Sequence, residues 1–115
     1  RNDIAQWIKY FLTGVIQTAE NAVNRLKEIT ELKKNIETKY IVKMGKRSKQ
    51  GFKLLEFLFS KPVINYKDVQ KLFSLTPRAA NSLVNTFVEY GILNEVTGQK
   101  RNKVFVFNKY LNLFN

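Results

Sequence analysis

The stretch SLTPRAANSLVNTFVEYG, residues 74–91, decides the fold. Ser74-Leu75 predicts a tight turn, and Thr76-Pro77 is typical of a helix start, with a capping hydroxyl followed by Pro at the first helical position. The helix is expected to run to about Tyr90 and to be closed by Gly91.

This helix is predicted to have two different faces. The residues expected to face a core are Ala79, Ala80, Leu83, Val84, Phe87 and Val88. Polar residues recur at helical spacing on the opposite face: Arg78, Asn81, Ser82, Asn85 and Glu89. A helix of this kind can be held on a core while its polar side chains remain free for recognition.

Upstream, the pattern predicts two shorter helices with an extended run between them. Ser48 is expected to cap a helix that runs to about Ser60, where Lys61-Pro62 stops it. Residues 63–65 read as extended, and Asn65 is a fair N-cap for a helix over residues 66–73.

Downstream, a β-hairpin is expected. Residues 92–96 and 103–107 read as strands around a turn at 97–102, with Phe105 and Phe107 on one face of the second strand. A last short helix holds Tyr110 and Leu111. Helix, short strand, helix, turn, helix and hairpin is the order of a winged helix-turn-helix domain, in which the hairpin is the wing.

Residues 3–43 contain no Pro, and their apolar residues recur in steps of three and four, which predicts a long helix. A break near Gly14 or Asn21 stays open. The aromatic residues of its first half, such as Trp7, spread the apolar surface beyond one stripe, so this half is expected to be buried on several sides. Residues 45–51 read as a linker, and the resulting prediction is a mainly α chain with a helical arm at 1–44 and a winged domain at 45–115.

The 115 residues include 20 Lys and Arg against 9 Asp and Glu, a net charge of +11, with neither His nor Cys. This composition excludes Ser-His-Asp and Cys-His nucleophiles, Cys/His zinc sites, haem and Fe–S ligation, and disulfides. We therefore expect no catalytic, cofactor-binding or metal-binding residues in this chain. No uncharged run exceeds ten residues, no signal-peptide pattern is present and the first residue is Arg, so a piece of a longer cytoplasmic chain without membrane contact is expected.

The charge favours DNA as the partner. Residues 45–115 contain 12 basic and 4 acidic residues, hence +8 of the +11. We expect the polar helix face to enter the major groove and the wing to contact the backbone. The predicted DNA-binding residues are Arg78, Asn81, Ser82, Asn85, Lys100, Arg101, Asn102 and Lys103. The alternative is a winged helix that binds protein, since this fold hosts both uses.

Several segments resemble the C-terminal region of Fic (filamentation induced by cAMP) family proteins. Residues 4–12 and 17–22 are similar to the last helix of a Fic core, and the charged helix that follows is similar to a connecting helix. The segments 54–63, 76–83, 93–98 and 101–105 extend the similarity over the winged domain.

This resemblance implies an accessory domain that regulates transcription or its own enzyme, or a target-docking module of a protein adenylyltransferase, which transfers AMP from ATP to protein hydroxyls. The Fic catalytic motif contains a His, so none of its residues maps onto this chain. The implied partners are DNA, an upstream Fic core and a second copy bound through the arm.

Overall fold

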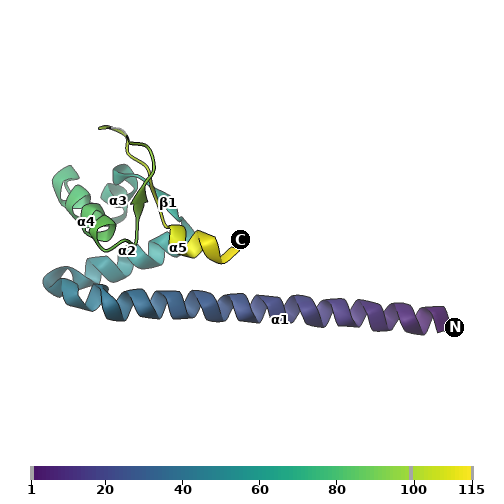
Figure 1. The fold of residues 1–115 in the computed structure, drawn as a ribbon. Helices are drawn as coiled ribbons and strands as arrows, with labels where there is room; N and C mark the ends of the chain where they lie inside the picture. Colours follow the sequence, from purple (N-terminus) through teal and green to yellow (C-terminus); the bar gives the residue numbers. More distant parts are fainter. Residues whose placement is uncertain (1, 99, 115) are drawn as a thin grey trace.

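The computed structural model describes residues 2–98 and 100–114 and shows a mainly helical chain with a small antiparallel sheet (Figure 1). A long helical arm is followed by a winged helix-turn-helix domain, as the sequence predicts. The elements are α1 (Asn2–Lys39), η1 (Ile41–Arg47), α2 (Ser48–Ser60), β1 (Val63–Ile64), α3 (Tyr66–Phe73), α4 (Pro77–Glu89), β2 (Asn94–Glu95), β3 (Phe105–Val106), α5 (Asn108–Leu111) and η2 (Asn112–Phe114).

Helix α1 is continuous through Gly14 and Asn21, which answers the question that the sequence leaves open. Its 38 residues span about 57 Å at the helical rise, and they account for most of the molecule's 69 Å long axis. The winged domain packs on the C-terminal part of α1, and the N-terminal part projects beyond it (Figure 1).

The prediction of a linker at residues 45–51 is wrong. Residues 41–47 form a 3₁₀ helix with a kink at Gly45, where φ is +64°, and α2 starts directly after it. Gly51 is buried, and a Cβ there would lie 2.7 Å from the Met44 sulfur and 3.1 Å from the Ile41 side chain. Gly51 therefore allows η1 to pack closely on α2, and it is not a point of flexibility.

Ser48 is not the N-cap of α2. It is the first helical residue, and the residue at the cap position, Arg47, makes no side-chain capping hydrogen bond. The Ser48 N–H donates to the Gly45 carbonyl instead. Because η1 already supplies backbone acceptors, this helix start needs no capping hydroxyl.

The other predicted helix ends are confirmed. The Asn65 side chain accepts from the Asp68 N–H while the Asp68 carboxylate accepts from the Asn65 N–H, each at 3.0 Å, which completes a capping box. Thr76 Oγ1 accepts from the Ala79 N–H at 3.2 Å. Gly91 adopts φ +76° just after α4.

The sheet has three strands rather than the two of a simple hairpin, in the order β1-β3-β2. Val63 and Asn94 both lie opposite Val106, and the ladders are only two residues long. The predicted strand at 92–96 is shorter because the N–H groups of Ile92 and Leu93 donate to the Phe87 carbonyl, at 3.0 and 3.3 Å. These two residues are therefore tied to the end of α4 and are unavailable to a strand.

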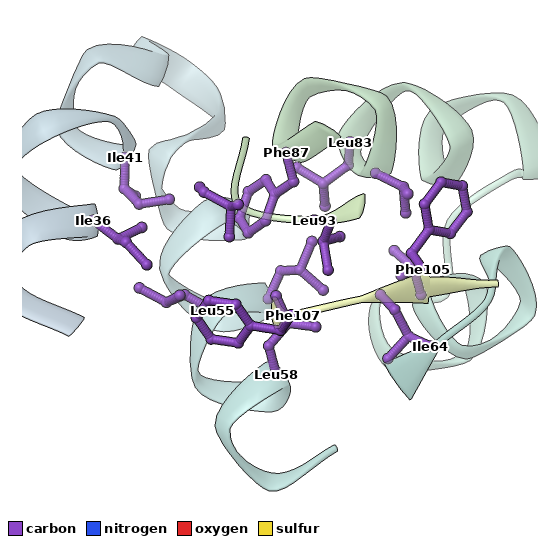
Figure 2. Packing of buried hydrophobic residues seen from close by; sticks show 14 of the residues in the cluster. Ile36, Ile41, Leu55, Leu58, Ile64, Leu83, Phe87, Leu93, Phe105 and Phe107 are labelled. Atoms are coloured by element: carbon purple, nitrogen blue, oxygen red, sulfur yellow. The ribbon is translucent and has the colours of Figure 1, made fainter. Parts of the chain in front are cut away.

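One apolar core joins α1, η1, α2, β1, α3, α4 and β3 (Figure 2). Among the described residues, no polar or charged residue is fully buried. The fully buried members are Ile36, Ile41, Leu54, Leu55, Leu58, Ile64, Val69, Ala80, Leu83, Val84, Phe87, Ile92, Leu93, Phe105 and Phe107. The end of the arm thus contributes Ile36 to the same core as the wing, and the division at residues 44 and 45 stays a prediction.

Candidate nucleic-acid interface

Helix α4 presents the two faces that its sequence predicts. Ala80, Leu83, Val84 and Phe87 are fully buried against the core. On the opposite face, Arg78, Ser82, Asn85 and Glu89 are exposed, and Asn81 is half-buried. The polar face of α4 is therefore open to solvent, and neither the arm nor the wing covers the four exposed side chains.

A hollow of about 280 Å³ lies where α3, the start of α4 and the base of the wing meet. It is lined by Asn65, Tyr66, Lys67, Gln70, Pro77, Asn81, Asn102 and Lys103. The structure thus brings together three predicted site residues, Asn81, Asn102 and Lys103. The Asn81 Oδ1 atom is buried and accepts no hydrogen bond from any described residue.

Tyr66 connects α3 to the polar face of α4. Its hydroxyl donates to Asn85 Oδ1 at 3.1 Å, and its ring packs on Phe105 of β3 with 5.1 Å between centroids. Burial raises the pKa of Tyr66 above its ordinary value, and the negative charge of Glu95 adds to the shift. The hydroxyl therefore stays protonated at neutral pH and orients Asn85, which leaves the Asn85 amide N–H₂ free to donate.

The turn of the wing is organised by Glu95. Its carboxylate accepts from the Gly98 N–H at 2.8 Å and from the Thr97 hydroxyl at 3.1 Å. The Gly98 hydrogen bond is the main cause that lowers the pKa of Glu95 below its ordinary value, and the charge of Lys103 acts in the same direction. Glu95 is therefore a structural carboxylate of the wing, and it lies beside the basic residues.

Acidification is expected to release this turn. Because the pKa of Glu95 is lowered on folding, its stabilising contribution is present at neutral pH and is lost as the pH falls through the folded pKa. An NMR titration of the Gly98 amide should therefore show an inflection below the pH at which an ordinary glutamate titrates. Glu95→Gln should abolish that inflection, and an unchanged titration in this variant would contradict the assignment.

The tip of the wing stands apart from the hollow. Lys100 and Arg101 are exposed and do not line it, and Asn102 adopts φ +54°, which turns the chain back toward β3. The wing rises on the side away from α1 (Figure 1). The eight predicted residues therefore form two groups: the α4 face with the hollow, and the cationic tip.

Two polar residues of α3 that line the hollow and could contact a bound molecule were not predicted. Lys67 and Gln70 lie one turn apart on α3, with Lys67 exposed and Gln70 half-buried. Their spacing of three was a visible signal of a shared helix face. What the sequence did not show is that this face borders α4 and the wing.

The described residues contain no cluster of three or more carboxylates that could hold a metal ion. None of the described helices combines the length and hydropathy needed to cross a bilayer.

Comparison with protein-family models gives no match, and comparison with curated protein sequences gives none either. Among solved structures, the chain is similar to a transcriptional regulator homologue protein from Pyrococcus horikoshii OT3. The TM-score is 0.41 at 20% sequence identity, over 68% of this chain and 89% of the other.

Proposed function

We propose that the winged domain binds duplex DNA as a regulatory module, with α4 in the major groove and the wing on the backbone. The observation that supports this most directly is the open polar face of α4 beside a hollow flanked by Lys67 and Lys103. Such a face contains the side-chain types that hydrogen-bond base edges and phosphates.

The α4 face would read bases. Arg78 is exposed in the first turn of the helix, and a guanidinium can bind the acceptor edge of guanine with two hydrogen bonds. Asn85 lies two turns further along, and Tyr66 fixes its orientation. A positioned asparagine amide can pair with adenine, so these two residues are the proposed base-reading pair.

The hollow and the wing would hold the backbone. The two lysines that flank the hollow can attract a phosphate, and Lys100 and Arg101 at the wing tip can contact a second stretch of backbone. Together with Arg78, this gives five cationic contacts within one surface.

The test is a fluorescence-anisotropy titration with duplex DNA at 50 and 200 mM salt. The four proposed phosphate contacts, from Lys67, Lys103, Lys100 and Arg101, predict that affinity falls about 150-fold between these two conditions. Lys100→Ala combined with Arg101→Ala should weaken binding and reduce the slope of log K against log salt by about 2, because two contacts are lost.

Lys27→Ala combined with Lys34→Ala is the matched control, because it removes the same charge from exposed positions of the arm. This control should leave the slope unchanged. Absence of binding at 50 mM salt would overturn the proposal, and equal losses in the two double variants would show attraction by net charge alone.

A second candidate is the one that the Fic resemblance implies, namely an accessory module of a cytoplasmic protein adenylyltransferase that contacts protein. The observation in its favour is the exposed apolar surface on the N-terminal half of α1, which includes Trp7, Tyr10 and Phe11. In this candidate the chain itself is not catalytic, and an upstream Fic core would cover that surface. It predicts a chain that does not bind DNA and whose arm binds another domain.

A further inference from the structure

The N-terminal half of α1 exposes a broad apolar surface to solvent. Of the 14 exposed large hydrophobic residues in the described part of the chain, ten lie on α1 between Ile4 and Leu26. Tyr10 is 82% exposed and Trp7 63%. A surface of this kind on one projecting helix indicates an interface with another chain or segment.

Part of this surface forms a shallow groove of about 670 Å³ along one side of the helix. It is lined by Trp7, Tyr10, Phe11, Gly14, Val15, Thr18, Ala19 and Ala22. The large aromatic residues occupy its N-terminal part, where Trp7 stacks on Phe11 at 5.5 Å, and small residues occupy most of the rest. The groove therefore has a bulky end and a shallow end.

This arrangement is complementary to itself when the helix is reversed. A two-fold axis between positions 14 and 15 places each residue i opposite residue 29 − i of a second copy. The eight lining residues then pair completely among themselves, as Trp7 with Ala22, Tyr10 with Ala19, Phe11 with Thr18, and Gly14 with Val15. Each aromatic residue faces a small one, which is the pairing that lets two helices approach closely along an isologous interface.

The length of the bare surface fits the same pairing. The chain's own winged domain reaches along α1 as far as Arg25, whose guanidinium lies 5.2 Å from the Phe114 ring centroid. Under the two-fold pairing, Ile4 of the second copy would lie opposite Arg25. Residues 4–24 of the second copy would therefore lie along the bare part of α1.

The apolar area is sufficient for a stable interface. An aromatic side chain offers about 150–250 Å², so Trp7, Tyr10 and Phe11 leave roughly 400 Å² open at their exposed fractions. Aliphatic neighbours on the same side, such as Ile4 and Val15, increase this area. The total approaches the value of about 800 Å² per partner that is typical of specific interfaces.

We propose that two copies of this chain dimerise through an antiparallel pairing of the N-terminal halves of α1, about a two-fold axis between Gly14 and Val15. The dimer places the two winged domains at opposite ends of the paired arms. It does not depend on DNA binding, and its failure would leave the proposed function of the winged domain untouched.

Disulfide cross-linking tests the pairing, because the chain has no Cys of its own. Gly14→Cys places the new thiols beside the axis, and a Cβ at this position meets no atom within 4 Å in the single chain. Ala22→Cys is the matched control on the same groove. The two copies of residue 22 would be about 22 Å apart along the direction of the paired helices. A disulfide requires Cα atoms within about 7 Å.

Mild oxidation should convert Gly14→Cys to a covalent dimer and leave Ala22→Cys monomeric on a non-reducing gel. Cross-linking of both variants would show a parallel pairing and overturn the proposal. Cross-linking of neither would overturn it as well, and it would favour another partner for this surface.

Sedimentation of the unmodified chain gives an independent measurement. We expect a dimer at micromolar concentration. Phe11→Asp should raise the dissociation constant of the dimer at least tenfold. Gln17→Asp introduces the same charge at an exposed position outside the groove and should leave the dimer intact. A monomeric wild-type chain at 100 μM would contradict the proposal.

Discussion

Phe87→Ala is expected to lower the free energy of unfolding by about 3–5 kcal/mol. Phe87 is fully buried at the centre of the core, between α4 and the other core-forming elements (Figure 2). Its removal takes away apolar contacts and leaves a cavity that the fixed neighbouring helices cannot fill. Small domains are stable by only about 5–15 kcal/mol, so this variant should be close to its unfolding threshold.

Urea denaturation followed by circular dichroism measures this loss. Phe114→Ala is the control, because Phe114 is 53% exposed and the same truncation should there change stability by less than about 1 kcal/mol. Similar midpoints for the two variants would show that Phe87 is not packed as described.

Ile41→Ala is expected to lower the free energy of unfolding by about 2–5 kcal/mol. Ile41 lies in η1, is fully buried and would contact any side chain added at Gly51. This loss is expected because η1 packs on the domain with Ile41 in the core. The prediction therefore tests whether residues 41–47 belong to the folded domain.

The neighbouring residue supplies the control. Val42 follows Ile41 in the same 3₁₀ helix but is 56% exposed, so Val42→Ala should alter stability by no more than about 0.5 kcal/mol. Thermal unfolding of the two variants side by side should separate them clearly. Equal and small effects would show that η1 does not pack on the domain as described.

The elements that the sequence predicted correctly have local causes. Asn65, Thr76 and Gly91 each act on backbone groups within three residues, so their types alone indicate where α3 and α4 begin and where α4 ends. The polar face of α4 was predictable for the same reason, because helical spacing alone separates it from the core face.

The elements that it missed depend on distant contacts. Gly51 reads as a flexible residue until Met44 is seen packed beside it, and Ile92 reads as a strand residue until its N–H is seen bonded to Phe87. The hollow combines residues from three separate segments, 65–70, 77–81 and 102–103. No pattern within one segment contains that information, which is why Lys67 was not among the predicted residues.

Because α1 is one continuous helix, it fixes the distance between the two winged domains of the proposed dimer. Position 36, where the arm enters the core, lies about 32 Å from the proposed two-fold axis at the helical rise, so the two such positions would be about 65 Å apart along the paired arms. A stiff helix without a hinge would keep the two winged domains at a constant separation, so that one spacing of DNA half-sites would be favoured.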